Sequence, residues 1–334
     1  MRFEKIAVLG SGGWGTALAG LVAAHGGEVV LWARDPGLAV SMRTSRQNSR
    51  HLPGVELPRN IRPVSDLADC ADAGLVLMAV PSLAVRRTAV ALAKVLDRRL
   101  PVLVSCTKGI ESGSGLLMSQ VISSLLPGSP VAALSGPNLA PEVAAGIPAA
   151  GVIGCETPSL CADLQSVLST RTFRTYTSDD LAGVQLGGAL KNIFAIAAGV
   201  SDGFGMGDNA KAALVTRSLA EMTRLGCAMG GQRETFSGLS GTGDLMVTCF
   251  SRQSRNRQFG ERLGRGESPS GILASTPSVA EGVPTSRSAM ECARRLGIDV
   301  PILSEVFAVL HEGKPPRESL ACLLGRPPKP ECDR

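Results

Sequence analysis

The sequence predicts an α/β fold: an N-terminal Rossmann-like, doubly wound and mostly parallel sheet, followed by a mainly α-helical C-terminal domain. Residues 5–9 form a short apolar run that leads straight into a glycine-rich turn. Short apolar runs then alternate with helical periodicity as far as residue 178, after which only long helical segments follow. Such alternation is typical of a parallel sheet with helices on both faces, and the change after residue 178 predicts a second domain.

The glycine-rich turn has the pattern Gly10-x-Gly12-x-x-Gly15 and precedes an alanine- and leucine-rich helical segment. In this setting Gly10 allows the sharp bend, Gly12 lets the backbone approach a pyrophosphate, and Gly15 lets helix and strand pack closely. The start of the helix offers free N–H groups and a positive dipole end to the phosphates. Short glycine patterns recur by chance, but the strand before this one and the helix after it indicate a dinucleotide site.

A second strand is predicted at residues 28–33 and ends at Arg34 and Asp35. This is about twenty residues after the turn, where a Rossmann unit places the side chain that meets the adenosine ribose. An acid there favours NAD, whereas an arginine accepts the additional phosphate of NADP. Because the two occur side by side, the sequence predicts NADP or NAD without choosing between them. A solvated strand end is the alternative interpretation.

Residues 36–66 are polar and are predicted to form an irregular loop, marked by Pro53 and Pro58, in which His51 is an ordinary surface histidine. Beyond it we expect strands at 75–80, 102–105, 131–134, 150–154 and 172–176, and helices at 83–96, 116–125, 181–200, 209–226, 285–296 and 302–310. The chain therefore divides into a dinucleotide-binding domain (1–178), a helical substrate domain (179–325) and a proline-rich tail (326–334) that is predicted to be disordered.

Three segments rich in chemically active groups fall at the ends of predicted strands. They are residues 10–15, 107–109 and 135–140. In doubly wound sheets, ligands bind outside the carboxyl ends of the strands, so we expect these segments to share one cleft. The alternatives are that Lys108 is a solvated loop lysine and that Gly136 belongs to a simple turn.

The composition argues against several classes of protein. The chain has 334 residues, of which 44% are hydrophobic, which is enough for two domains with sizeable cores. The net charge of +5 suits a small anionic substrate, and basic residues do not interleave with aromatic ones, so nucleic acid is not an expected partner. No apolar run reaches the roughly 18 residues of a transmembrane helix, so we expect no membrane span.

The cysteines and histidines predict neither a disulfide framework nor a metal site. Nine cysteines are scattered without a C-x-x-C pair, and three histidines lie far apart without ligand spacing. The N-terminus has no secretory signal, so this pattern predicts a reducing, cytoplasmic location.

Lys191 is the most informative residue of the second half, because its neighbours on a helix are small or apolar. At three and four positions before and after it stand Gly187, Gly188, Phe194 and Ala195. Helical glycines cost about 1 kcal/mol each relative to alanine, so they indicate close approach of another group. Burial lowers the pKa of a lysine, which can then exchange a proton with a reacting oxygen. The alternative is a structural lysine at a domain boundary.

Two further segments supply partners for this lysine. Asp244 follows a glycine pair, and it is either a carboxylate that faces Lys191 or a helix N-cap. Burial and a facing carboxylate shift the pKa of Lys191 in opposite directions, so the sign of the net shift stays open. Residues 251–257, which include Ser254, Arg255 and Asn256, form a compact donor set that suits a phosphate ester, with a solvated basic loop as the alternative.

These residues lie in longer motifs that resemble the bacterial type of NAD(P)-dependent glycerol-3-phosphate dehydrogenases. The motifs are GSGGWGTALA at 10–19, VVLWARDP at 29–36, CTKGIE at 106–111, SGPNLAPEVA at 135–144, GVQLGGALKNIFAIAAGVSDG at 183–203, GTGDLMVTC at 241–249, QSRNRQFG at 253–260 and VAEGVPT at 279–285. The resemblance covers nearly the whole chain, and the block around Lys191 is its most specific part.

The resemblance implies reversible hydride transfer between NAD(P)H and dihydroxyacetone phosphate, giving sn-glycerol 3-phosphate for glycerophospholipid synthesis. It implies that Lys191 accepts and donates the proton, with Asp244 as its catalytic partner. The implied substrate contacts are Lys108, Gly136, Asn138, Lys191, Asp244, Ser254, Arg255 and Asn256. The cofactor contacts, including the glycine turn, are Gly10, Gly12, Gly13, Trp14, Gly15, Arg34, Lys108, Ala140, Arg255, Val279 and Glu281. Further candidates near the carbonyl or the lysine are Asn192 and Thr248. The implied partners are substrate and product, with a homodimer as the assembly.

One departure from the family pattern concerns the substrate contacts. Bacterial members usually carry Ser or Thr followed by Phe where this chain has Asn138 and Leu139. Animal relatives carry an asparagine at this position, so an amide can fill the role, and only the detailed contact is in question.

Two other functions compete with this one. A dehydrogenase for a 3-hydroxy acid or a ketopantoate-like substrate would share the fold, but the donor set at 254–256 favours a phosphate. A non-catalytic NAD(P) sensor would need no proton carrier in an apolar setting, which argues against it for Lys191.

Overall fold

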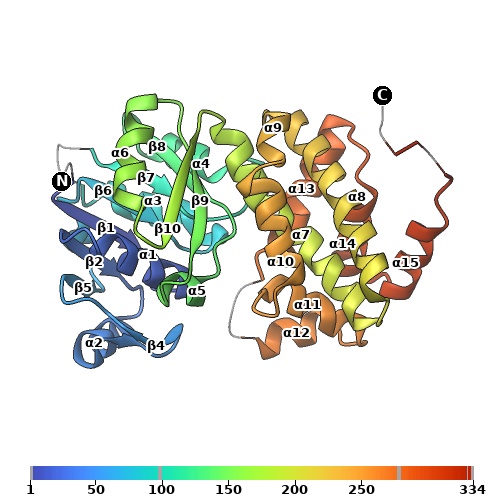
Figure 1. Cartoon of the computed structure of the whole chain (residues 1–334), viewed down its shortest axis with the longest axis horizontal. Helices are drawn as coiled ribbons and strands as arrows, with labels where there is room; N and C mark the ends of the chain where they lie inside the picture. The colour runs from blue at the N-terminus through green and yellow to red at the C-terminus, as the bar shows by residue number, and fades with distance from the viewer. Residues whose placement is uncertain (1–2, 97–99, 277–279, 329, 332–334) are drawn as a thin grey trace.

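The computed structural model describes residues 3–96, 100–276, 280–328 and 330–331, which form two halves side by side (Figure 1). The N-terminal half is built on an eight-stranded sheet in the order β10-β9-β8-β7-β6-β1-β2-β5. Its strands are β1 (Lys5–Leu9), β2 (Glu28–Trp32), β5 (Ile61–Val64), β6 (Leu75–Met78), β7 (Val102–Ser105), β8 (Val131–Ser135), β9 (Ala149–Gly154) and β10 (Phe173–Ser178). All neighbours pair in parallel except β8 and β9, so the predicted doubly wound, mostly parallel sheet is confirmed.

The sheet is buried on both faces because successive side chains of a strand point to opposite sides. Ile6 and Val8 of β1 pack into the core beneath α1 (Gly13–Ala23) and α6 (Pro158–Leu168). Ala7 and Leu9 pack into the core on the other face, beneath α3 (Val85–Ala93) and α4 (Met118–Leu125). The strands therefore read as continuous apolar runs, which made most of them predictable.

The prediction of an irregular loop over residues 36–66 is wrong. This stretch contains α2 (Pro36–Ser45), a two-stranded ribbon of β3 (Gln47–Asn48) and β4 (Leu52–Glu56), and the edge strand β5. Asp35 caps α2 and Pro36 occupies its first turn, both favourable positions. Pro63 is tolerated in β5 because an edge strand leaves one side without ladder hydrogen bonds.

The C-terminal half is a bundle of helices around α7 (Leu181–Gly203). The others are α8 (Gly207–Ala228), α9 (Arg233–Phe236), α10 (Asp244–Phe250), α11 (Arg255–Gly264), α12 (Pro269–Ser275), α13 (Gly282–Leu296), α14 (Pro301–His311) and α15 (Pro316–Leu324). Helices α8, α10, α11, α13 and α14 all pack against α7. The last strand ends at Ser178 and α7 begins at Leu181, so the two kinds of structure meet between them.

Helix α7 is the one helix of the described residues that is long and apolar enough to cross a membrane by length and composition. Its most apolar window is 83% buried within the fold. A core helix passes the same test, and α7 occupies the centre of the bundle in Figure 1. We therefore treat α7 as the core helix of this half.

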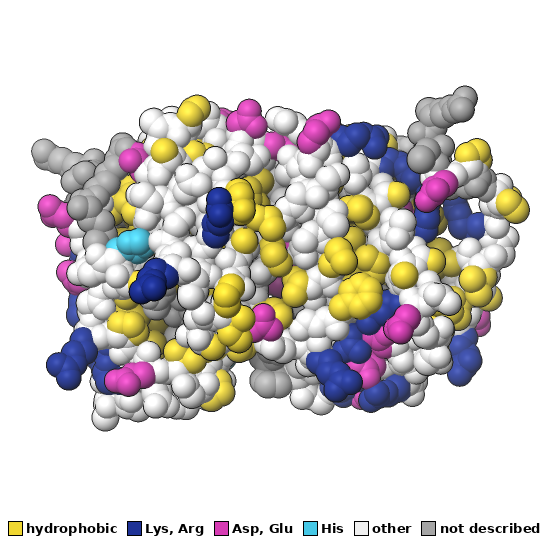
Figure 2. All heavy atoms as spheres, viewed as in Figure 1, with side chains coloured by type: hydrophobic (Ala, Val, Ile, Leu, Met, Phe, Trp, Pro, Cys, Tyr) yellow, Lys and Arg dark blue, Asp and Glu magenta, His cyan; other side chains and the backbone are white. Residues whose placement is uncertain are grey.

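The surface of the helical half mixes charges of both signs. Figure 2 shows basic and acidic side chains interleaved over the edge where Figure 1 places α11 and α12. Ion pairs join Arg262 to Glu267 and Arg265 to Glu261 there. Within the tail, residues 326–328, 330 and 331 form no helix or strand, and the prediction of disorder at residue 329 and at 332–334 falls outside the described residues.

Candidate active site

The glycine turn is tight at both ends and open in the middle. Gly10 has φ +115°, and a Cβ on it would lie 2.6 Å from the carbonyl oxygen of Ala79. A Cβ on Gly15 would collide with the carbonyl oxygen of Gly10. At Gly12, which caps α1, a Cβ would meet nothing within 4 Å. The turn therefore leaves space beside the first N–H groups of α1, as a pyrophosphate requires.

A buried asparagine holds this turn from the side. Asn48 of β3 is fully buried, and its Nδ2 donates to the carbonyl of Ser11 at 2.8 Å and to Oγ1 of Thr16 at 2.7 Å. Its Oδ1 accepts a hydrogen bond from the backbone N–H of His51 at 3.2 Å. The ribbon thus fixes the turn and brings the His51 carbonyl to 2.9 Å from where a Cβ on Gly13 would lie. Sequence reasoning missed Asn48 because it stands in a polar stretch without periodicity.

The two candidates at the end of β2 have different surroundings. Asp35 accepts hydrogen bonds from the N–H of Gly37 at 2.9 Å and from Arg50 at 2.7 Å. The Arg50 guanidinium holds the pKa of the Asp35 carboxyl below its ordinary value. Arg34 is exposed and, among the residues described, has no hydrogen-bond or ion-pair partner. The carboxylate is therefore occupied, whereas the arginine is available to a ligand.

Lys191, Asp244 and Lys108 form one charged cluster. The Lys191 Nζ donates to Oδ1 of Asp244 and to Oγ1 of Thr248. The Lys108 Nζ contacts Oδ2 of the same aspartate at 2.5 Å and donates to the carbonyl of Gly136 at 2.9 Å. Asp244 is fully buried, so it bridges the two ammonium groups with both oxygens away from solvent.

Close packing of small residues brings these groups together. A Cβ on Gly187 of α7 would lie 2.5 Å from the carbonyl oxygen of Ser240, which stands just before α10. A Cβ on Gly188 would collide with Oγ of Ser135 and lie 3.3 Å from Cγ of Lys108. The glycines before Lys191 thus mark close approach on two sides, as the sequence predicted. Asp244 is the first residue of α10 rather than its N-cap, which is Gly243.

Burial determines the sign of the Lys191 shift. The pKa of Lys191 is lowered to about 8, chiefly because burial removes water from the ammonium, and the nearby charge of Lys108 acts in the same direction. The Asp244 carboxylate acts in the opposite direction but does not cancel the effect of burial. A lysine in this state loses and regains its proton near neutral pH, as an acid–base group must.

Comparison with known proteins identifies the family. The family profile for the N-terminus of NAD-dependent glycerol-3-phosphate dehydrogenase matches residues 5–161, and the profile for its C-terminus matches residues 180–321. The chain belongs to the NAD-dependent glycerol-3-phosphate dehydrogenase family.

Individual relatives match over almost their whole length. The chain is 46% identical over 332 residues to a glycerol-3-phosphate dehydrogenase, NAD(P)+, of Streptomyces avermitilis, covering 98% of both chains. It is also 46% identical over 332 residues to the protein of that name from Geobacter sp. strain M21, covering 98% of this chain and 99% of the relative. The crystal structure of glycerol-3-phosphate dehydrogenase from Coxiella burnetii superposes with a TM-score of 0.93 at 37% identity, covering 97% of this chain and 99% of that one.

Asn138 carries a buried side-chain amide beside the charged cluster of this glycerol-3-phosphate dehydrogenase family member. Its Oδ1 and Nδ2 are buried and have no hydrogen-bond partner within the described residues. An unpaired buried amide is costly, and a ligand that supplies both a donor and an acceptor would satisfy it. The residue follows Gly136, whose carbonyl holds Lys108, and precedes Ala140 at the start of α5 (Ala140–Ala144). The Cβ of Ala140 lies 3.7 Å from where a Cβ on Gly13 would stand, so this loop contacts the glycine turn.

The predicted phosphate-binding cluster is only partly available in this family member. Ser254 caps α11 and accepts a hydrogen bond from the N–H of Arg257 at 3.2 Å. Asn256 donates to Oδ1 of Asn192 at 2.8 Å and accepts from the N–H of Gly282 at 2.9 Å. Both side chains are thus hydrogen-bonded within the protein.

Arg255 is the exposed member of that cluster. Its positive charge contributes to lowering the pKa of His51, for which burial is the main cause. It also opposes the rise that burial causes in the pKa of Glu281. Since these two groups belong to different halves, Arg255 lies close to both halves of the molecule.

Glu281, a predicted cofactor contact, links the two halves directly. Its Oε1 accepts from the N–H of Ser82 at 3.1 Å, and its Oε2 from the Ser82 hydroxyl at 2.5 Å. Burial raises the pKa of this carboxyl. Val279 falls outside the described residues. Within the part of the chain that the structure describes, no group of three or more His, Cys, Asp or Glu side chains is placed to hold a metal ion.

Proposed function

We propose that the chain catalyses the reversible NAD(P)H-dependent reduction of dihydroxyacetone phosphate to sn-glycerol 3-phosphate, which would supply glycerophospholipid synthesis. The observation that carries the proposal is the buried Lys191, held by Asp244, with a pKa of about 8. Its partner Lys108 follows a strand of the sheet that carries the glycine turn, and the relatives described above are glycerol-3-phosphate dehydrogenases.

The protein's part in the chemistry is to orient a carbonyl and to move one proton. When bound, the nicotinamide supplies or accepts the hydride. In the reducing direction the Lys191 ammonium polarises the carbonyl oxygen and then donates its proton to that oxygen. Lys108 adds positive charge beside it, and Asp244 keeps both lysines in place. In the oxidising direction, neutral Lys191 takes the proton from the hydroxyl.

The phosphate and the polar end of the substrate have separate candidates. Arg255, close to both halves, offers a guanidinium for the phosphate ester, and the unpaired amide of Asn138 offers a donor and an acceptor beside Lys108. Ser254 and Asn256 act by holding α11 and its neighbours rather than through free side-chain groups. This assignment keeps Asn138 in the role that Ser or Thr usually fills.

We also propose a preference for NADPH over NADH. Asp35 is occupied by the cap of α2 and by Arg50, whereas Arg34 is exposed and unpaired within the described residues. An arginine in this position accepts the 2′-phosphate of NADP. Arg34→Gln should weaken binding of 2′,5′-ADP about tenfold and leave binding of 5′-AMP unchanged, measured by calorimetry. Equal losses for both nucleotides would contradict the preference.

The decisive experiment is oxidation of NADPH and NADH, in parallel, on addition of dihydroxyacetone phosphate. Oxidation with this substrate and not with ketopantoate or a 3-keto acid supports the proposal. Activity only with a non-phosphorylated substrate would identify another dehydrogenase, and cofactor binding without turnover of any of these substrates would identify a sensor. The homodimer and the cytoplasmic location stay predictions, which light scattering and cell fractionation would test.

A further inference from the structure

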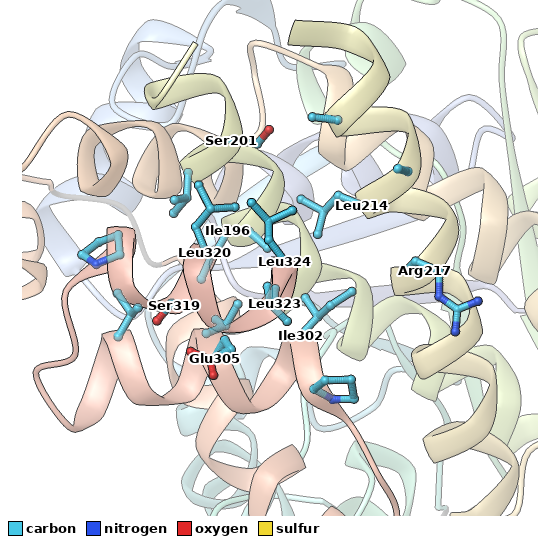
Figure 3. A pocket seen from close by; sticks show the side chains of 18 of the residues that line it. Ile196, Ser201, Leu214, Arg217, Ile302, Glu305, Ser319, Leu320, Leu323 and Leu324 are labelled. Carbon is cyan, nitrogen blue, oxygen red and sulfur yellow. The ribbon is translucent and has the colours of Figure 1, made fainter. Parts of the chain in front are cut away.

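A second cavity lies in the helical half, away from the charged cluster. It has a volume of about 620 Å³, opens to solvent on one side, and is lined by α7, α8, α14, α15 and the residues that follow α15. In Figure 3 the side chains of Leu320, Leu323 and Leu324 from α15 point toward Leu214 of α8 and Ile302 of α14. The volume is within the range of pockets that hold small organic ligands, about 300–1,000 Å³. None of the residues assigned above to the substrate, the cofactor or the proton transfer lines this cavity.

The wall of the cavity contains one polar group that points to a ligand. Ser319 of α15 is 6% exposed, lines the cavity, and its hydroxyl has no hydrogen-bond partner within the described residues. A buried hydroxyl without a partner costs free energy, which a polar atom of a ligand could recover. The rest of the wall is mostly aliphatic, so the ligand that fits is chiefly apolar.

The rim of the cavity is positively charged. Three arginines line it: Arg217 and Arg224 of α8, and Arg326 after α15. Arg217 donates to the backbone carbonyl of Glu331 at 3.1 Å, and no carboxylate of the described chain forms an ion pair with it. Arg224 donates to the backbone carbonyl of Asp299, and Arg326 pairs with the carboxylate of the same residue.

The carboxylates of the wall are already engaged. Glu221 of α8 accepts hydrogen bonds from the N–H groups of Ile302 at 2.8 Å and Leu303 at 3.2 Å, so it caps α14. Glu305 of α14 pairs with Lys314 at 2.6 Å. Neither carboxylate therefore pairs with Arg217, which keeps its positive charge at the cavity.

We propose that this cavity binds a long-chain fatty acid, with the acyl chain between α15 and the bundle and the carboxylate on Arg217. An aliphatic wall accepts the chain by burying apolar surface, and a guanidinium without a carboxylate partner accepts the head through a charge-assisted hydrogen bond. A neutral or cationic ligand would leave Arg217 without a carboxylate partner. The site goes beyond the proposed dehydrogenase function and does not depend on it.

The test is a calorimetric titration of the purified protein with palmitate, below its micellar concentration and without substrate or cofactor. Saturable binding of one palmitate per chain is expected. Arg217→Gln should weaken palmitate about tenfold and leave the uncharged palmityl alcohol unchanged. Arg233→Gln, an exposed arginine on α9 outside the cavity, is the matched control and should bind both like the wild type.

Filling the cavity gives an independent test. Leu214→Trp and Ala210→Phe place bulk inside the lining and should each abolish palmitate binding, whereas Leu273→Trp on the exposed face of α12 should not. Thermal unfolding of each variant shows that it is folded before it is titrated. Two filling variants are used so that the test remains possible if one of them does not fold. Binding of palmitate that both filling variants leave intact would overturn the proposal.

Three further results would contradict the proposal. Absence of saturable binding by the wild type overturns the fatty-acid site outright. If light scattering also shows a dimer that Leu214→Trp converts to a monomer, the cavity is instead an interface between two copies of the chain. Equal weakening of palmitate and palmityl alcohol by Arg217→Gln would remove the carboxylate contact and would likewise contradict the proposal.

Discussion

At the scale of single residues, the arrangement of Asp244 between two lysines decides what the site can do. One buried carboxylate faces two ammonium groups, so the cluster carries a net positive charge when Lys191 is protonated. Buried charges persist only when they are paired, and here each is paired through a different oxygen of the same side chain. The surplus positive charge favours an anionic substrate and an oxygen that gains negative charge during the reaction.

The pKa of Lys191 predicts opposite pH profiles for the two directions. Reduction needs the protonated lysine, so kcat/KM for dihydroxyacetone phosphate should fall as the pH rises through about 8. Oxidation needs the neutral lysine, so kcat/KM for sn-glycerol 3-phosphate should rise over the same interval and then level off. Steady-state kinetics between pH 6 and pH 10 measures both. Profiles that move in the same direction would rule out Lys191 as the proton carrier.

Removal of the same side chain tests its role without a pH change. Lys191→Ala should lower kcat by at least two orders of magnitude, the scale of lost acid–base catalysis. Binding of NADPH, followed by calorimetry, should be retained and shows that the variant is folded. A variant with near-normal kcat is incompatible with the assignment.

Arg255 should affect substrate binding rather than the chemical step. Arg255→Ala removes an exposed guanidinium close to both halves and should raise KM for dihydroxyacetone phosphate about tenfold, as expected for one charge-assisted hydrogen bond. Arg252→Ala, an exposed arginine three positions earlier, is the control. An unchanged KM for Arg255→Ala would assign the phosphate to another group.

At the scale of elements, α7 and the segment before α10 are held together by glycine. Gly187 lies against the backbone of Ser240, and that segment leads directly to Asp244. The position of the catalytic carboxylate therefore depends on how closely two backbones approach, rather than on a side-chain contact.

Substitution of this glycine should uncouple the pair. Gly187→Ala places a Cβ 2.5 Å from a backbone oxygen, so the two elements must separate. We expect kcat to fall and the free energy of unfolding to drop by about 1–3 kcal/mol, as overpacking usually causes. Gly20→Ala in α1, where a Cβ meets nothing within 4 Å, should instead raise the free energy of unfolding by about 0.5–1 kcal/mol. Denaturant unfolding of both variants separates crowding from helix propensity.

The sequence predicted the buried elements better than the exposed ones. The inner strands β1, β2, β6, β7 and β8 were predictable because both faces are covered and apolar residues run without interruption. The ribbon of β3 and β4 and the edge strand β5 were not, since they are short, polar or contain proline. Helix α11 was read as a donor cluster because its sequence over residues 255–264 is mostly charged and polar.

The candidate site shows a similar division. The motifs identified Lys191 and Asp244 as partners, and the structure places them in contact. That Lys108 reaches the same carboxylate, 136 positions away in the chain, depends on tertiary packing that no spacing reports. The hydrogen bonds that occupy Ser254 and Asn256 within the protein were equally invisible, because donor-rich sequence does not reveal which donors are free. The ligand contacts of these residues stay predictions.

At the scale of the whole molecule, buried polar contacts join the two halves. Gln185 of α7 accepts from the N–H of Ser119 at 2.9 Å and donates to its hydroxyl at 2.8 Å, and Glu281 of the helical half holds Ser82. These contacts place the glycine turn and the charged cluster in a fixed relation. Together with the Lys108–Asp244 pair, they build the candidate site from residues of both halves.

The link through Gln185 should contribute measurably to stability. Gln185→Ala leaves the buried N–H and hydroxyl of Ser119 without these partners, so the free energy of unfolding should fall by about 1–3 kcal/mol. Gln258→Ala, an exposed glutamine on α11, should change it far less. Denaturant unfolding compares the two, and equal effects would remove the link from the account of stability.

Helix α7 carries Lys191 and also forms part of the wall of the proposed fatty-acid cavity. Lys191 stands in its first half, and Ser201, in the wall of the second cavity, follows about 15 Å further along the axis at 1.5 Å per residue. A ligand that tilts α7 at one end changes the alignment of Lys191 with Asp244 at the other. Thermodynamic linkage then requires reciprocity: whatever factor a fatty acid imposes on substrate affinity, the substrate imposes on the affinity for the fatty acid. If both proposed ligands bind, α7 is the element through which one would affect the other.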